Sequence, residues 1–326
     1  MNEVNIITNK MNHLIDPSLT IWAWEVPVYL FFGGLAAGTM IISSLVHYFG
    51  KEKEYPNAAG PLAILGPILL SLGMGALFMD LEYKLHVFRF YTTFKITSPM
   101  SWGSWILVLY YPVGILMILG VIKKSFPNFY KSYLDEFMQG SGFLNRNINS
   151  LRKWCEKNMK LIAMAGLPAA IALGIYTGIL LSGLGARPFW NASIWGPIFL
   201  TSGFSTALAL NLIMTKNKHE EHMSGIVDII AILFELVMLL LFVINMLSGA
   251  TIKREAINLI LGGPYTHHFW IFVIVMGLLF PLLLETLELK GKRFPKYLAP
   301  VLVLIGGLVF RFVVVNAGQM TTWIHY

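Results

Sequence analysis

The sequence predicts an all-α integral membrane protein with eight transmembrane helices. Of its 326 residues, 56% are hydrophobic and 13% are charged, whereas about 25% of the residues of a soluble domain are charged. A helix needs about 20 mainly apolar residues to cross a bilayer. Eight segments meet this requirement, and they cover residues 20–48, 59–82, 100–122, 159–183, 193–215, 225–249, 267–288 and 297–317.

The basic residues predict the orientation of these helices. Eight spans place both termini on one side of the membrane. That side carries seven Lys and Arg residues, the other side carries sixteen, and Arg311 lies within a span. The positive-inside rule therefore places the richer side in the cytoplasm and the tails 1–19 and 318–326 in the periplasm. The net charge of +7 is explained by these loops, so no nucleic acid partner is expected.

The first helix, 20–48, is expected in the middle of the bundle. Small residues let another helix approach it closely, at Gly33, Gly34, Ala36, Ala37 and Gly38. Glu25 lies one turn inside its first end, where a carboxylate costs on the order of 2–3 kcal/mol unless it reaches an interface. We expect Glu25 to face another part of the protein; contact with interfacial water is the alternative.

Two loops combine basic and aromatic residues, which suggests a role beyond connecting the helices. The cytoplasmic stretch 123–158 mixes basic and aromatic residues, which is typical of a segment along the membrane surface. The outer loop 83–99 is also aromatic and basic, and it is either an interfacial flank or a docking surface.

A weak repeat indicates two halves of four helices. Three spacings are shared by the first and fifth helices, at Pro27, Gly33 and Ala37 and at Pro197, Gly203 and Ala207. Both helices run in the same direction, so a duplication would be parallel. Chance matches between common membrane residues are the alternative.

Polar groups from four helices fall at a similar depth toward the outer side: Glu25, Asp80, Tyr176 and Arg311. Each is costly in lipid, so we expect them to face inward and satisfy one another. Trp102, Trp105, Trp190 and Trp195 lie at a similar depth, and an aromatic belt explains most of them.

A second set of acids starts from the inner side. Asp228 and Glu235 are seven residues apart and share one helix face, about 10 Å apart along the axis. Glu285 lies near the inner end of the seventh helix, and His47 near that of the first. This arrangement suggests proton movement, with hydrogen-bonded structural acids as the alternative.

The sequence offers few ligands for a bound metal cofactor. The single cysteine, Cys155, excludes a cysteine-ligated cluster or zinc site within the chain. A haem with two histidine ligands needs imidazoles at one depth on neighbouring helices, and His47 lies across the membrane from His267 and His268. We expect no haem, iron–sulfur cluster or metal.

Four ordered motifs resemble the polysulfide reductase membrane-subunit (NrfD/PsrC) family: WEVPVYLFFGGLAAGT, SPMSWGSW, GIYTGILLS and RPFWNASIWGPIFLTSGFSTALAL. The similarity extends from about Trp22 to Asn316. It implies a cofactor-free subunit of the bacterial inner membrane, built from two four-helix bundles with both termini in the periplasm. The domains would be helices 1–3 over 20–122, the loop 123–158, helix 4 over 159–183, and the second bundle over 193–317.

The resemblance also implies a quinone site. The family uses a tyrosine of the fourth helix, which Tyr176 matches, and often a His or Asn at the start of the first helix. Here Glu25 stands in place of that residue. Asp80, Arg311, Trp24 and Trp102 complete the expected site, and Asp228, Glu235 and Glu285 form the expected proton pathway.

We therefore expect a quinone-interacting membrane anchor that passes electrons between menaquinone or ubiquinone and a periplasmic, four-cluster ferredoxin-like iron–sulfur subunit. That subunit would serve a molybdopterin catalytic subunit. A secondary transporter with a midplane acid and a purely structural anchor are the alternatives; transporters place their sites near the midplane, whereas most polar groups here lie toward the outer side.

Overall fold

The computed structural model describes residues 22–81, 83–135, 143–292 and 294–322. Eight helical segments in this part of the chain are long and apolar enough to cross a membrane, which confirms the predicted number. They are α1 (Glu25–Tyr48), α3 (Pro61–Asp80), α5 (Pro99–Ser125), α9 (Met159–Ser182), α10 (Trp195–Met214), α11 (Lys218–Leu247), the π-helix η3 (His268–Leu279) continued by α13 (Phe280–Leu289), and α14 (Leu298–Gln319).

Shorter helices lie in the connections: α2 (Pro56–Ala59), η1 (Lys84–His86), α4 (Arg89–Thr92), α6 (Pro127–Phe129), the π-turn η2 (Tyr130–Leu134), α8 (Phe143–Lys157) and α12 (Thr251–Leu261). From the sequence, α12 is expected only as part of a loop. Its Ala256, Ile257 and Ile260 are buried at helical spacing, so an amphipathic helix too short to span covers this end of the bundle.

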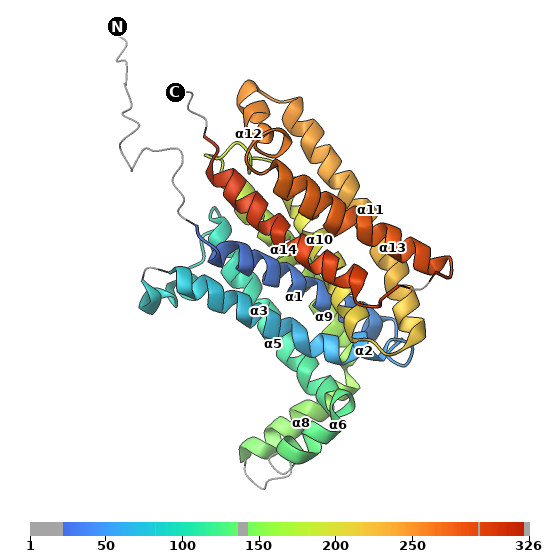
Figure 1. The fold of residues 1–326 in the computed structure, drawn as a ribbon. Coiled ribbons are helices and arrows are strands. Elements are labelled where there is room, and N and C mark those ends of the chain that lie inside the picture. Colours follow the sequence, from blue (N-terminus) through green and yellow to red (C-terminus); the bar gives the residue numbers. More distant parts are fainter. Residues whose placement is uncertain (1–21, 82, 136–142, 293, 323–326) are drawn as a thin grey trace.

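Helix α1 is the central element, as predicted. It packs against α3, α9 and α10, is buried over most of its length, and crosses the middle of Figure 1. Helix α5 packs on α3 and α9, whereas α11 and α14 pack on α10. The long helices are therefore arranged around α1 and α10.

Glycines let α1 and α10 touch through their backbones. A Cβ atom on Gly38 would lie 2.3 Å from the carbonyl oxygen of Gly203 and 2.6 Å from the Cβ of Ala207. A Cβ on Gly203 would in turn lie 2.5 Å from the oxygen of Gly34. Only glycine fits these positions without separating the helices, which is the use of small residues expected at a membrane helix crossing.

The described ends of the chain meet at one end of the bundle (Figure 1). The backbone N–H of Trp22 donates to Gln319 Oε1 at 2.8 Å, and Gln319 Nε2 donates to the Trp22 carbonyl at 2.9 Å. We call this end, with Glu25, Asp80 and Gln319, the terminal face. The other end, with Tyr48, Pro61 and Leu298, is the opposite face.

The buried carboxylate of Glu220 connects several segments at the opposite face. Glu220, in the first turn of α11, accepts the backbone N–H groups of Asn57 at 3.1 Å and Ala58 at 2.7 Å. It also accepts the hydroxyl of Thr215 at 3.0 Å. This carboxylate therefore caps α2 and joins the two halves of the chain, a role that the sequence patterns do not predict.

A separate helical hairpin projects from the opposite face beside α5 (Figure 1). Within it, Arg152 of α8 is buried, forms an ion pair with Glu156 at 2.8 Å and lies over the ring of Tyr130 at 5.6 Å. The predicted loop 123–158 thus contains a defined helical pair.

The glycine crossing predicts a stability effect. Gly38→Ala must push α1 and α10 apart, and overpacking of this kind costs about 1–3 kcal/mol. We expect a lower thermal unfolding midpoint in detergent. Gly225→Ala is the control, because a Cβ there has no atom within 4 Å; equal midpoints for the two variants would contradict the crossing.

Candidate functional site

Tyr176 lies near the terminal-face end of α9. Its side chain is 5% exposed and its ring lies directly over Gly103 of α5, where a Cβ atom would be 2.0 Å from Tyr176 Cζ. Gly103 belongs to the SPMSWGSW motif. Two of the four sequence motifs therefore meet through this ring and this glycine.

Tyr29 links Tyr176 with two further tyrosines. Tyr29 of α1 is buried and lies within electrostatic interaction distance of Tyr176, Tyr91 and Tyr111. The Tyr111 hydroxyl is 3.2 Å from Ser71 Oγ. Burial, together with Tyr111, raises the pKa of Tyr91, so this phenol remains a hydrogen-bond donor at neutral pH. Tyr29 is missing from the residues predicted for the site, although it follows Glu25 by one helical turn.

Glu25 and Asp80 lie at the rim of the same region. Glu25 is the first residue of α1 and Asp80 the last residue of α3, and their carboxyl groups are within interaction distance. One Glu25 oxygen is buried without a hydrogen-bond partner. Tyr176, Glu25 and Asp80 therefore all lie toward the terminal-face ends of their helices, α9, α1 and α3.

The two tryptophans predicted for the quinone site, Trp24 and Trp102, are exposed. Trp24 is 50% exposed and Trp102 is 40% exposed. Trp102 Nε1 donates to the Ile96 carbonyl at 2.7 Å and so holds the end of the loop 83–99 against α5. The position of Trp102 fits the predicted aromatic belt, as does that of Trp105 at 39% exposure. In contrast, Trp190 and Trp195, predicted for the same belt, are buried in the core at 3% and 1%.

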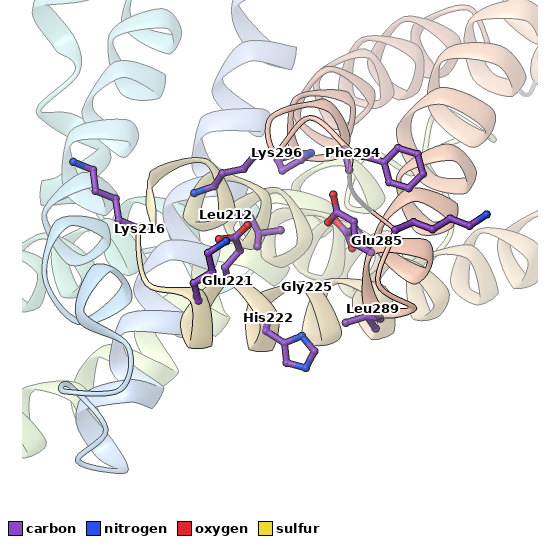
Figure 2. Close-up of a pocket in the computed structure, with 14 residues that line it drawn as sticks. Leu212, Lys216, Glu221, His222, Gly225, Glu285, Leu289, Phe294 and Lys296 are labelled. Carbon is purple, nitrogen blue, oxygen red and sulfur yellow. The ribbon is translucent and has the colours of Figure 1, made fainter.

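The acids of the second set start at a pocket on the opposite face. The pocket has a volume of about 810 Å³ and lies between α11 and α13 (Figure 2). Figure 2 shows Glu221 and His222 on α11 and Glu285 and Leu289 on α13 around this space. Glu285 is 3% exposed, and both of its carboxyl oxygens lack a hydrogen-bond partner.

Asp228 lies directly behind Glu285. Its Oδ1 accepts the Ser205 hydroxyl at 2.6 Å. Its carboxyl group is close enough to interact with that of Glu285, but without full hydrogen-bonding geometry, so Asp228 Oδ2 is also buried without a partner. Asp228 thus lies between Ser205 of α10 and Glu285 of α13.

Glu235 lies two turns farther along α11. It lines a small cavity of about 10 Å³ together with Ser202, Ser205 and Thr206. A cavity needs roughly 10–15 Å³ and several polar partners to hold one water molecule. One water at this place would connect Glu235 with Ser205, the hydroxyl that binds Asp228.

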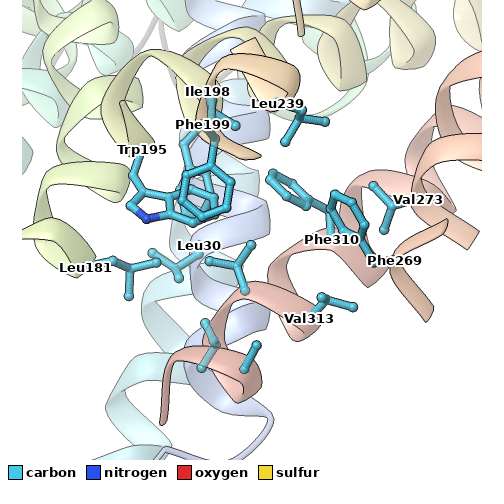
Figure 3. Close-up of a cluster of buried hydrophobic side chains, with 14 of the residues drawn as sticks. Leu30, Leu181, Trp195, Ile198, Phe199, Leu239, Phe269, Val273, Phe310 and Val313 are labelled. Carbon is cyan, nitrogen blue, oxygen red and sulfur yellow. The ribbon is translucent and has the colours of Figure 1, made fainter. Parts of the chain in front are cut away.

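Arg311 lies with Glu235, not with Glu25 and Asp80 as expected from the sequence. Its Nη1 donates to Ser202 Oγ at 2.6 Å, and Glu235 is its interacting acid. The guanidinium lies 4.7 Å from the centre of the Phe199 ring, within the buried aromatic cluster around Trp195, Phe199 and Phe310 shown in Figure 3.

The structure explains why Arg311 points this way. A Cβ on Gly34 would lie 3.4 Å from Arg311 Nη2, so the glycine crossing leaves room for the guanidinium. The position of Arg311 along its helix is close to the predicted one. Helix α14 ends at Gln319, so Arg311 lies about 12 Å from that end. The side of α14 from which it projects depends on the neighbouring helices.

His47 is separate from the acids of α11 and α13. Its Nε2 lies 2.8 Å from the Ala59 carbonyl oxygen and its Nδ1 lies 3.2 Å from Glu52. Within the described ranges, no group of three or more His, Cys, Asp and Glu side chains is arranged to hold a metal ion.

Comparison with known proteins identifies the family. A sequence profile described as "Polysulphide reductase, NrfD" matches residues 11–323. The chain belongs to this family. It is 29% identical to one of the polypeptides of polysulfide reductase from Wolinella succinogenes over 316 residues, which cover 92% of this chain and 94% of that protein.

Two further relatives show how broad the NrfD family is. The chain is 29% identical to protein NrfD of Escherichia coli, covering 92% of this chain and 96% of that protein. It is 27% identical to one of the subunits of tetrathionate reductase from Salmonella typhimurium, covering 84% and 72%. The chain is thus a multi-pass membrane protein of a family whose members include subunits of reductases acting on different substrates.

The contact between Gly103 and Tyr176 predicts strong coupling of two substitutions. Gly103→Ala should lower the unfolding midpoint in the wild-type background, since the new methyl group overlaps the ring. In a Tyr176→Leu background the same change should cost much less. The coupling energy from this double-mutant cycle should lie within about 0.5–3 kcal/mol.

Gly75→Ala is the control for this cycle, because a Cβ on Gly75 meets no atom within 4 Å. It should show no coupling to position 176. Additive effects of the changes at 103 and 176 would contradict the packing of the ring on α5.

Proposed function

We propose that this chain is the quinone-reactive membrane anchor of a respiratory reductase complex of the inner membrane, with its terminal face in the periplasm. The observation that supports the proposal is the buried Tyr176 phenol close to Tyr29, with the interacting pair Glu25 and Asp80 at the same face. A quinone ring has two carbonyl oxygens, which need hydrogen-bond donors and a nearby group that exchanges protons. The tyrosines can donate hydrogen bonds to the carbonyl oxygens, and the two acids can exchange protons.

Each residue then has a defined role. The Tyr176 hydroxyl donates to one quinone carbonyl, and Tyr29 is placed to donate near it. Glu25 or Asp80 takes up or releases the proton that accompanies each electron at the ring. Menaquinone and ubiquinone both present the same pair of carbonyl groups to these residues.

The packing supports two functional halves. We assign α1, α3, α5 and α9 to one four-helix bundle, which holds the proposed quinone site. We assign α10, α11, η3 with α13, and α14 to the second, which holds the buried acids; α1 and α9 both pack against α10 where the two meet. We assign Arg311 to the second half, where it balances the charge of Glu235, and not to the quinone ring.

The second half carries protons in this proposal. The route starts at the pocket, passes Glu285, Asp228 and Ser205, and reaches Glu235 across the small cavity. Each step joins groups that are in contact or separated by room for one water. The route ends beside Arg311, which lies next to Gly34 of α1 and therefore at the boundary with the quinone half.

The terminal face receives the electron-transfer partner, a four-cluster ferredoxin-like iron–sulfur subunit, and through it a molybdopterin catalytic subunit. Arg187 is not available for this contact, because its Nη1 binds the carbonyls of Gln319 and Thr321 at 2.9 and 2.8 Å. Burial lowers its pKa. The docking surface is therefore assigned to the exposed loop 83–99, which Trp102 holds in place.

Tyr176→Phe tests the quinone site. Loss of one hydrogen bond should cost about 1 kcal/mol, which is roughly a fivefold loss of quinone affinity or quinone-linked turnover. The complex should remain assembled in the membrane. Tyr133→Phe, an exposed phenol of the opposite-face hairpin, should behave as wild type. Wild-type quinone kinetics in Tyr176→Phe would remove this residue from the site and favour a purely structural anchor.

Glu235→Gln tests the proton route. Gln keeps the shape and hydrogen bonding of Glu235 but cannot carry a proton, so proteoliposomes with the complete complex should lose quinone-coupled membrane potential. Electron transfer to an uncoupled acceptor should largely remain. Glu54→Gln, an exposed acid of the opposite face, should keep the potential; a full potential with Gln at position 235 would leave Glu235 a structural acid.

A further inference from the structure

The opposite-face pocket has a basic rim that the proton route does not use. Among its lining residues are four lysines, at positions 216, 218, 292 and 296. In the described part of the chain, none of them has a carboxylate oxygen within 4.0 Å. Lys296 Nζ donates to the Thr215 carbonyl, and Lys216 extends away from the pocket in Figure 2, so Lys218 and Lys292 are the cations most available to a ligand.

An apolar wall lies beside this rim. Leu212, Leu289, Phe294, Ala299 and Pro300 line the pocket. Leu289 is 42% exposed, and the neighbouring Tyr297 and Leu298 are also exposed. These residues begin or end membrane-spanning helices, so this surface borders the hydrocarbon region. A ligand of this pocket therefore meets a basic rim and an apolar side wall at once.

We propose that this pocket binds the phosphate headgroup of an anionic phospholipid, with its acyl chains along the apolar wall. Basic pockets between membrane helices at the cytoplasmic side are a known environment for such headgroups. The volume of about 810 Å³ lies in the range of roughly 300–1,000 Å³ found for ligand sites. The proposal is independent of the quinone reaction.

The acids of the pocket are compatible with this ligand. Glu285 is buried, at 3% exposure. Glu221 and Glu288 also line the pocket and interact with each other; four lysines outnumber the three glutamates of the lining. A phosphate held by Lys218 and Lys292 stays at the mouth of the pocket. Free phosphate would use the same cations but gain nothing from Leu289 and Phe294.

Native mass spectrometry of the complete complex in mild detergent tests the proposal. Delipidated complex titrated with phosphatidylglycerol should take up one tightly bound lipid. The double variant Lys218→Gln/Lys292→Gln should bind it roughly tenfold or more weakly, because each lysine near an anionic headgroup contributes substantially. Lys153→Gln/Lys157→Gln on α8 removes the same charge elsewhere on the opposite face and should keep wild-type binding.

Three results would overturn the proposal. Unchanged lipid binding in Lys218→Gln/Lys292→Gln would place the lipid elsewhere. Equal weakening by the α8 variant would indicate unspecific attraction by net charge. Displacement of phosphatidylglycerol by inorganic phosphate at similar concentration would assign the site to free phosphate. Since binding is measured without turnover, none of these results depends on the proposed quinone site.

Discussion

The backbone contact between α1 and α10 at Gly34, Gly38 and Gly203 is the constraint on which the rest of the structure depends. These helices touch without side chains between them; α3 and α9 pack on α1, α11 and α14 pack on α10, and α9 and α14 each contact both. Gly34 of this crossing also lies beside the Arg311 guanidinium, with 3.4 Å between a Cβ at position 34 and Arg311 Nη2. The crossing therefore joins α1 to α10, and the buried charge of Arg311 lies next to it.

This arrangement separates two kinds of polar chemistry. The tyrosines and the Glu25–Asp80 pair lie at the terminal face, in the half around α1. The acids Glu285, Asp228 and Glu235 lie in the half around α10 and lead from the opposite face toward Arg311. The proposed function uses both regions, and Arg311, at the end of the acid series, lies beside Gly34 of the glycine crossing.

The sequence predicted the spans well because length and apolarity decide them, and it predicted a central α1 from its small residues. Apolarity places the start of this span at 225, whereas α11 begins at Lys218. Asn217 caps the helix by accepting the His219 N–H at 2.9 Å, and Asn217 followed three residues later by Glu220 is the sequence pattern that marks this start. Helical rise gave the depth of Arg311 but not its direction, since depth says nothing about which neighbour a side chain faces. The contacts of Tyr29 and Gly103 with Tyr176 likewise depend on how distant helices pack.

Photolabelling with an azido-quinone tests the central claim that quinone binds at the terminal face of the α1 half. The complete complex is irradiated with the probe, and labelled peptides are identified by mass spectrometry with and without excess unlabelled quinone. The account predicts protectable label on peptides from the terminal-face ends of α5 and α9, which carry Gly103 and Tyr176. Protectable label confined to the opposite-face pocket around Glu285 and Leu289 would contradict it.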